Sequence, residues 1–346
     1  MKRLTALILA VSLIFSGFSL TGNVSDFRRT AEGCFEVVVR TLRSTFGIRN
    51  YPDYDELCDI PETENGYVPQ GYCFSESKNL HFISYYHSEK ASIIAVIDNE
   101  NNTVKTLNLK KANGKDFMGH AGGIAEDGCN FYIVEGKKIY RLYLNELVGA
   151  ENSADITLQE YITTDVKCSY LNCDGEFLYA GEFYTFTTDG SYDTDNSHHM
   201  AISLFETTYA RCNAYRISDV AQAFANESEE MLVPSMIFTT PNCVQGFARM
   251  PDGSFALSIS YGRNNNSSLR LYKNVTENDA DFSVAYGEKS VPAYHLGNKA
   301  ETCSLRMPPL LEGIDDMNGE VSGIFESCAQ KYSDAAVIVE KICIFS

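Results

Sequence analysis

The chain has 346 residues, 46 of them acidic and 28 basic, which gives a net charge of −18 at neutral pH. Hydrophobic residues make up 44% and charged residues 21%, which supports a folded core and excludes a disordered, solvated chain. The acidic charge argues against nucleic acid and anionic membranes as partners, because both would repel the protein.

Residues 1–19 have the layout of a secretory signal peptide. A short basic start precedes the apolar run Leu4–Leu20, and the small residues Gly17 and Ser19 suit cleavage after Ser19. We therefore expect a secreted or cell-surface protein that is soluble and makes no membrane contact after cleavage. The alternative is an uncleaved anchor, for which 17 apolar residues are at the short limit.

Residues 20–66 differ in character from the rest of the chain. Apolar residues recur at three- and four-residue steps over Asn23–Gly47, which predicts a helix that Ser25 can cap. The segment Tyr51–Gly66 is rich in proline and acidic residues, which is typical of an irregular connector. Two further helical insertions are predicted, Leu142–Leu147 and Val220–Leu232, the second capped by Ser218 or Asp219.

Residues 67–346 contain five repeated units, each with a short strand, a turn and two further strands, and the turn is X-Gly in four of the five. The units begin near Gln70, Gly122, Ser169, Gln245 and Glu312. The step from each start to the end of the second strand stays within 13 to 15 residues. This regularity predicts an all-β fold, a β-propeller of five blades with the N-terminal helix packed outside it. The long third and fourth units leave room for a sixth blade, and a β-sandwich is the alternative fold.

Eleven cysteines occur without any Cys-x-x-Cys motif. Cys168, Cys243 and Cys343 lie in apolar, strand-like runs, which favours buried thiols that act as small hydrophobic residues. Export would also permit a disulfide framework, for which Cys34 and Cys58 are the first pair to test. Because the count is odd, at least one thiol stays unpaired within a monomer.

Several short motifs stand at or near the starts and ends of the repeated strands. They are Pro69-Gln70-Gly71, His120-Ala121-Gly122-Gly123, Gln245-Gly246, Ser258-Ile259-Ser260-Tyr261-Gly262-Arg263, Glu312-Gly313 and Phe325-Glu326-Ser327 with Tyr332. These motifs resemble a family of exported bacterial β-propeller proteins that are common in actinobacteria. The resemblance covers about residues 66–346 and implies a propeller fold and export, but no reaction. A looser similarity to lactonase and gluconolactonase propellers rests on Glu-Gly at strand starts. Their repeated Asn and Asp metal ligands are missing here, so calcium is not implied.

The innermost strands of a propeller line its central channel, and ligands usually approach one mouth of it. Polar residues at equivalent positions of different blades therefore converge on one site. The candidate catalytic residues are His120, Glu182, Glu312 and Glu326, and the candidate ligand-binding residues are Gln70, Tyr85, Glu135, Gln245, Tyr261 and Arg263. Carboxylates near one axis raise each other's pKa, and a histidine beside them can act as a general base. The alternative is structural: a water-filled channel is lined by polar groups, and Arg263 can pair with one carboxylate.

The expected function is binding of a small molecule or glycan at the channel mouth. One alternative is a carboxylate-dependent hydrolase of glycosides, esters or lactones at the same mouth, and another is an extracellular protein-interaction scaffold. No motif supports a metal site or another cofactor; Asp193-Thr194-Asp195 is only a weak hint of a divalent cation. His198 and His199 lie in a polar insertion that could cover the mouth, although such a pair is usually plain polar surface.

Overall fold

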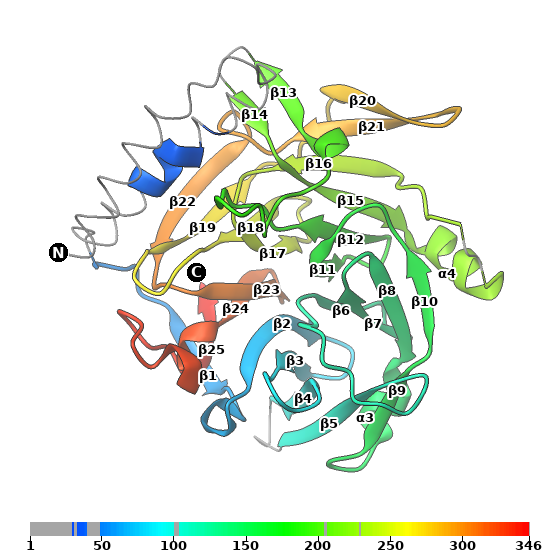
Figure 1. Ribbon diagram of the computed structural model, residues 1–346, viewed down its shortest axis with the longest axis vertical. Coiled ribbons are helices and arrows are strands. Elements are labelled where there is room, and N and C mark those ends of the chain that lie inside the picture. Colours follow the sequence, from blue (N-terminus) through cyan, green and yellow to red (C-terminus); the bar gives the residue numbers. More distant parts are fainter. Residues whose placement is uncertain are drawn as a thin grey trace.

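The structure is a computed structural model that describes residue 30 and residues 33–39, 49–99, 104–203, 206–227 and 230–345. Five antiparallel sheets stand around a common axis, so the predicted five-bladed propeller is confirmed (Figure 1). The innermost strands contact one another in a closed ring. They are β2 (Val68–Ser75), β6 (Ile124–Glu126), β11 (Cys168–Cys173), β17 (Val244–Arg249) and β23 (Leu311–Met317).

Each blade continues outward through three more strands. The second strands are β3 (Leu80–Tyr86), β7 (Asn130–Glu135), β12 (Phe177–Glu182), β18 (Phe255–Ile259) and β24 (Glu320–Phe325). The third strands are β4 (Ile93–Asp98), β8 (Lys138–Tyr143), β15 (Ala210–Arg216), β19 (Ser267–Tyr272) and β25 (Lys341–Phe345). The fourth strands are β5 (Val104–Lys111), β10 (Glu160–Thr163), β16 (Met236–Thr240), β22 (Glu301–Met307) and β1 (Asp55–Asp59). Numbering the blades by their innermost strands makes blade 1 the sheet of β2 and blade 5 the sheet of β23.

Blade 5 is closed by a strand from the other end of the chain. The segment predicted as an irregular connector contains β1, which pairs antiparallel with β25. The amide of Ile60 extends this closure by donating to the carbonyl of Glu340 at 2.8 Å. The acidic sequence of β1 hid the strand, because only one of its five residues is buried.

Some elements are additional to the four strands of each blade. Neither the long third unit nor the long fourth unit forms a sixth blade. The fourth unit instead sends a hairpin to blade 3: β21 (Lys289–His295) pairs parallel with β16 and antiparallel with β20 (Phe282–Tyr286). In blade 1, β9 (Asp155–Leu158) pairs parallel with β5. A separate hairpin joins β13 (Met200–Ser203) and β14 (Glu206–Thr208). The helices and 3-10 turns are α3 (Leu144–Gly149), α4 (Ile217–Ala225), η1 (Thr63–Asn65), η2 (Asn196–His198), η3 (Glu326–Cys328) and η4 (Gln330–Tyr332).

Both predicted helical insertions are present with shifted bounds, and α4 begins after Arg216 rather than at Ser218 or Asp219. Residues 33–39 are helical and lie outside the ring of blades, as expected (Figure 1). This helix packs Gly33 against Phe186, and Asn242 donates to Glu36 at 2.6 Å. The rest of the predicted helix and the signal segment lie outside the described residues. No helix in the described part of the chain is long and apolar enough to span a membrane.

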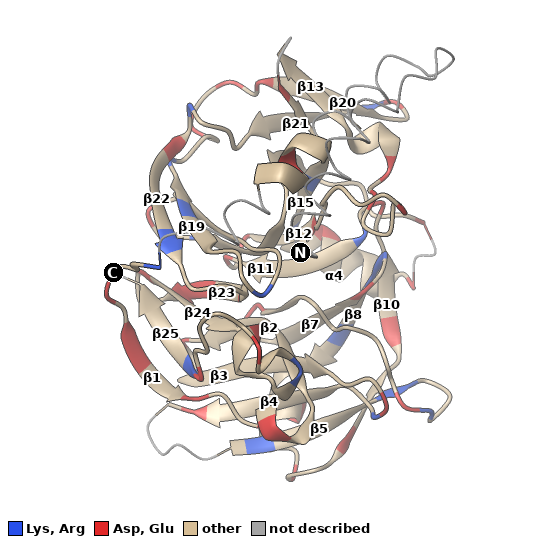
Figure 2. Cartoon of the chain, turned by 60° about the vertical axis from the view of Figure 1, so that its left-hand side comes forward, with Lys and Arg blue, Asp and Glu red and all other residues tan. Residues whose placement is uncertain are grey.

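The five largest apolar clusters among the described residues each fill the space between two neighbouring blades. Phe82 of blade 1 packs with Phe131 of blade 2, and Tyr179 of blade 3 packs with Phe247 of blade 4. No disulfide joins any of the eleven cysteines, all of which lie in described ranges, and seven are buried. Acidic residues are spread over several blades, so the net charge marks no single site (Figure 2).

Close approach at the axis explains the X-Gly starts of the repeat. A Cβ atom on Gly246 would lie 2.7 Å from the carbonyl of Glu312, and one on Gly313 would lie 2.6 Å from the amide of Tyr72. Gly71 and Gly123 are equally confined by the next blade. The glycines therefore let neighbouring innermost strands pack tightly, while the residue before each glycine stays at the start of its strand.

Candidate functional site

Five of the predicted residues meet at one end of the ring of innermost strands, and we call them the mouth cluster: Gln70, His120, Gln245, Glu312 and Glu326. Three of them lie near the starts of innermost strands, and His120 lies four residues before β6. Glu326 follows β24, which runs antiparallel to β23 and so returns to the same mouth. The repeat thus gathers residues from four blades.

The centre of the mouth cluster is a hydrogen-bonded pair of carboxyl groups, Glu312 and Glu326. Their side chains are buried, with only 5% and 6% of each residue exposed. Burial, reinforced by the charge of Glu326, raises the pKa of Glu312 well above its usual range. Burial also raises the pKa of Glu326 to about 7, although Gln70 and Glu312 donate hydrogen bonds to it. Glu312 therefore keeps its proton at neutral pH, and Glu326 accepts from it.

The carboxyl pair fixes the orientation of two glutamine amides. Gln70 Nε2 donates to Glu326 Oε1 at 2.5 Å and to the carbonyl of Pro69 at 2.9 Å. Gln245 Nε2 donates to Glu312 Oε1 at 3.0 Å. Because the Nε2 groups donate to the carboxyl pair, the Oε1 atom of each glutamine remains available as an acceptor. The Oε1 atom of Gln70 lies 3.4 Å from His120 Nδ1.

Aromatic and basic side chains form the rim of the mouth. The exposed ring of His120 packs on Tyr86, with ring centres 4.3 Å apart. Lys331 donates to the Tyr86 hydroxyl, and Tyr332 hydrogen bonds to the Glu326 carboxylate. Partial desolvation, followed by the charges of Lys331 and Lys167, lowers the pKa of His120 below its usual value. The imidazole is therefore neutral at neutral pH and can accept or donate one hydrogen bond.

Glu182 is the last residue of β12 and pairs with Cys168 as Phe325 pairs with Leu311, so it lies one position before the equivalent of Glu326 and has different neighbours. His198 Nδ1 lies 2.9 Å from Glu182 Oε1, and the amide of Lys167 also donates to that oxygen at 3.3 Å. Glu182 is 1% exposed and His198 is 4% exposed. His198 was expected as polar surface; it is instead buried, because η2 turns it inward onto Glu182. Glu182 therefore lies in a separate Glu–His pair.

This pair continues into a polar network inside blade 3. His198 Nε2 lies 3.9 Å from Asp165 Oδ2, which also accepts from Arg211 and from the hydroxyl of Tyr286. Asn213 donates to the other Asp165 oxygen at 2.8 Å. The network ties the insertion loop and the β20–β21 hairpin to blade 3, which gives these residues a structural role.

Four predicted ligand-binding residues lie outside the mouth cluster. Tyr85 is fully buried between blades 1 and 5, because alternation along β3 turns it inward and presents Tyr86 at the mouth. Glu135 lines a pocket between blades 1 and 2. Tyr261 packs on Phe183 and Tyr192. Arg263 pairs with Asp334 at 2.6 Å rather than with a mouth carboxylate, and it touches the rim by packing over Tyr332.

Three residues that complete the site were not predicted from the sequence: Tyr86, Lys331 and Tyr332. Tyr86 could have been found from strand alternation, since its neighbour Tyr85 falls on the core face of β3. Tyr332 belongs to a motif that carries the family resemblance but had no role assigned. Lys331 gave no signal, because only folding brings η4 next to β3. Among the described residues, no group of three or more His, Cys, Asp and Glu side chains is arranged to hold a metal ion.

Neither a family model nor a curated protein matches the sequence. Among solved structures, the PQQ-bound aldose sugar dehydrogenase of Streptomyces coelicolor is 12% identical over 85% of this chain and 99% of that chain, with a TM-score of 0.41. U3-55K is 11% identical over 84% and 98%, with a TM-score of 0.39. The tail fibre of Staphylococcus aureus phage P68 is 11% identical over 83% and 52%, with a TM-score of 0.41. These similarities assign no function, and the five sheets around one axis identify the chain as a five-bladed β-propeller.

Proposed function

We propose that this protein is an exported propeller that binds a neutral, hydroxyl-rich small molecule or glycan end at the mouth cluster. The orientation of Gln70 and Gln245 carries the proposal. The carboxyl pair below holds both Nε2 groups, so the mouth offers amide oxygens that accept from ligand hydroxyls. The signal-like residues 1–19 and the resemblance to exported bacterial propellers support export.

The protonation of the site fits a neutral ligand. Glu312 is neutral and Glu326 titrates near pH 7, while His120 is held neutral by desolvation and nearby lysines. Tyr86 and Tyr332 add aromatic surface at the rim, on which the apolar face of a sugar ring can pack. The site thus combines fixed acceptors with stacking surfaces, which is a combination that suits polyols.

Binding is tested with a panel of methyl glycosides of common neutral sugars and short neutral oligosaccharides. We expect at least one probe to raise the unfolding temperature of the mature protein and to give a measurable dissociation constant by calorimetry. The double variant Gln70→Ala/Gln245→Ala should weaken that binding by roughly tenfold or more, because two hydrogen bonds are lost.

Gln222→Ala is the matched control, since this glutamine is exposed on α4 in blade 3 and far from the mouth cluster in the fold. Its affinity should equal that of the wild type. A panel without any binder, or equal affinity in the double variant, contradicts the proposal.

A second candidate function is hydrolysis of an ester or lactone, and the shared proton of Glu312 and Glu326 favours it. A carboxylate beside a carboxylic acid can activate water while the acid protonates the leaving group or carbonyl oxygen. Glycosidases instead separate their two carboxyl groups by about 5 Å or more, which a hydrogen-bonded pair does not satisfy. The geometry therefore favours acyl chemistry over glycoside cleavage within the hydrolase alternative.

Turnover of aryl esters and simple lactones tests this candidate. An enzyme would lose activity in Glu326→Gln, and the rate of the wild type would rise with pH through about 7 as Glu326 loses its proton. Absence of product from every probe, with ligand binding intact, supports a binding protein instead. The scaffold alternative predicts neither binding nor turnover.

A further inference from the structure

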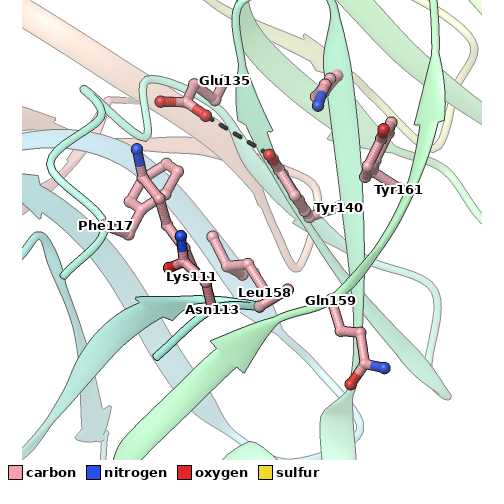
Figure 3. Close-up of a pocket in the computed structure, with 10 residues that line it drawn as sticks. Lys111, Asn113, Phe117, Glu135, Tyr140, Leu158, Gln159 and Tyr161 are labelled. Carbon is pink, nitrogen blue, oxygen red and sulfur yellow. Dashed lines mark hydrogen bonds between the residues drawn. The ribbon is translucent and has the colours of Figure 1, made fainter. Parts of the chain in front are cut away.

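A pocket lies between blades 1 and 2, apart from the mouth cluster. It has a volume of about 340 Å³, at the lower end of the range for small-ligand sites. Blade 1 contributes the end of β5, β9 and the loop that contains Phe117; blade 2 contributes Glu135, Tyr140 and Tyr161 (Figure 3). The volume suits one sugar unit rather than a polymer segment.

The pocket contains two lysines that form no ion pair with a described residue. No ion pair within the described ranges involves Lys111 or Lys138. Lys138 instead places its ammonium 3.7 Å from the ring centre of Tyr161, which holds the charge in place. By contrast, the adjacent Lys110 bridges Asp116 and Asp155 at 2.7 and 3.6 Å. In a protein of net charge −18, two lysines against the single carboxylate of Glu135 give this pocket a net positive charge, which indicates an anionic group on the ligand.

The other groups of the pocket recognise hydroxyls and an apolar face. The Glu135 carboxylate points toward the Tyr140 hydroxyl, 3.5 Å away, and Tyr161 stands beside Tyr140 (Figure 3). Asn113 and Gln159 supply amide groups at the edge. Tyr161 is 45% exposed, so a ring can pack against it.

We propose that this pocket binds a sugar acid, meaning a monosaccharide unit with one carboxylate. Lys111 and Lys138 receive the carboxylate, while Glu135 and the amide groups bind ring hydroxyls. The tyrosine pair packs against the apolar face of the ring. This site is independent of the mouth cluster, because none of its lining residues belongs to that cluster.

The probe is D-glucuronate, measured by calorimetry on the mature protein, with D-glucose as the same ring without the carboxylate. We expect D-glucuronate to bind, to weaken with added salt, and to exceed D-glucose in affinity by roughly tenfold or more. Lys138→Met and Lys111→Met should each weaken D-glucuronate binding by about tenfold. Lys137→Met is the matched control, because this exposed neighbour carries the same charge and does not line the pocket.

Each contrary result overturns the proposal in a recognisable way. If no binding is detected at about 20 mM D-glucuronate, the proposed site is refuted, because binding weaker than that is too weak to be specific. Equal affinity for D-glucose removes the role of the carboxylate, and equal loss in Lys137→Met shows general charge attraction. Binding lost in Gln70→Ala/Gln245→Ala but kept in both lysine variants places D-glucuronate at the mouth instead. Unchanged binding in Gln70→Ala/Gln245→Ala with loss in the lysine variants confirms a separate site.

Discussion

Blades 5 and 3 each carry a buried carboxyl group where the second strand ends, one position apart in the repeat, and use it for different purposes. Glu326 and Glu182 both stand at the mouth end of a second strand, and both are buried. In blade 5 the carboxyl group meets Glu312 and becomes part of a pair that shares a proton. In blade 3 it meets His198, which arrives on a long insertion.

The innermost strands of the two blades differ in the same way. Blade 5 begins with Glu312-Gly313, and the glycine lets β23 approach β2. Blade 3 has Tyr170 at the position of this glycine, and Gly181 on β12 makes room for its ring. The repeat therefore determines where a side chain lies along its blade. The neighbouring residues then determine whether that side chain belongs to the mouth cluster or to a structural network within the blade.

Removing the carboxyl group in blade 3 should have the largest effect on stability. We expect Glu182→Ala to lower the free energy of unfolding by about 3 kcal/mol, because it strips the buried His198 of its partner and leaves the Lys167 amide without an acceptor. Chemical denaturation measures the change. Glu176→Ala is the control, since its ion pair with Arg216 is exposed and contributes less than about 1 kcal/mol. A cost for Glu182→Ala no larger than that of the control would refute a structural role for the pair.

The contact between blades 5 and 1 can be broken by one methyl group. Gly313→Ala should cost about 2 kcal/mol, because the new Cβ would lie 2.6 Å from the Tyr72 amide and would push two innermost strands apart. Gly149→Ala is the control: nothing lies within 4 Å of its Cβ position, so stability should change little. Thermal and chemical unfolding of both variants decide between close packing and a general effect of alanine.

The carboxyl pair of blade 5 should make stability depend on pH. The pKa of Glu326 is raised from 4.5 to about 7, so the folded state holds a proton that the unfolded chain releases between these values. This contribution is present in full below about pH 4.5 and is lost as the pH rises through about 7. The free energy of unfolding should therefore fall across that interval.

Glu326→Gln should reduce this slope without abolishing it. Asp315, at the other end of β23, has a pKa that burial raises to about 7, and it acts in the same direction. Asn172 and the amide of Phe74 donate to its two oxygens at 2.7 and 2.9 Å. In the variant Glu326→Gln/Asp315→Asn the free energy of unfolding should depend on pH even less. An unchanged pH dependence in both variants would show that the carboxyl pair does not carry the shared proton.

The rim should matter least for stability. Arg263→Ala removes an exposed pair with Asp334 and should cost only about 0.5 kcal/mol. A loss above about 2 kcal/mol would mean that Arg263 holds Tyr332, and through it Glu326, more firmly than its exposure indicates.

The repeat was predictable because its signals are local. Turns such as Asp127-Gly128 and Asp174-Gly175 place glycine in the left-handed region, with φ of 87° and 85°. In both turns the aspartate accepts backbone amides and the hydroxyl of the tyrosine five residues later. Position in the repeat then located the mouth cluster, since equivalent residues of different blades converge on one axis.

The closing strand was not predictable, because Asp55–Asp59 is short and mostly exposed, and it pairs only with β25 at the other end of the chain. The partners of the charged residues were equally hidden. The sequence offered several carboxylates as partners for Arg263, which pairs with Asp334 in the structure. His198 belongs to a polar stretch of the sequence, yet it is buried against Glu182.

The sequence alone determined the five-blade repeat, the X-Gly strand starts and five of the ten candidate residues of the mouth, because turn chemistry and strand periodicity act over a few residues. Only the tertiary structure decided that Glu312 and Glu326 share a proton, that Glu182 has a structural role in blade 3, and that Lys111 and Lys138 line one pocket between blades 1 and 2. Those outcomes depend on burial and on contacts between blades, which arise only when distant segments pack together.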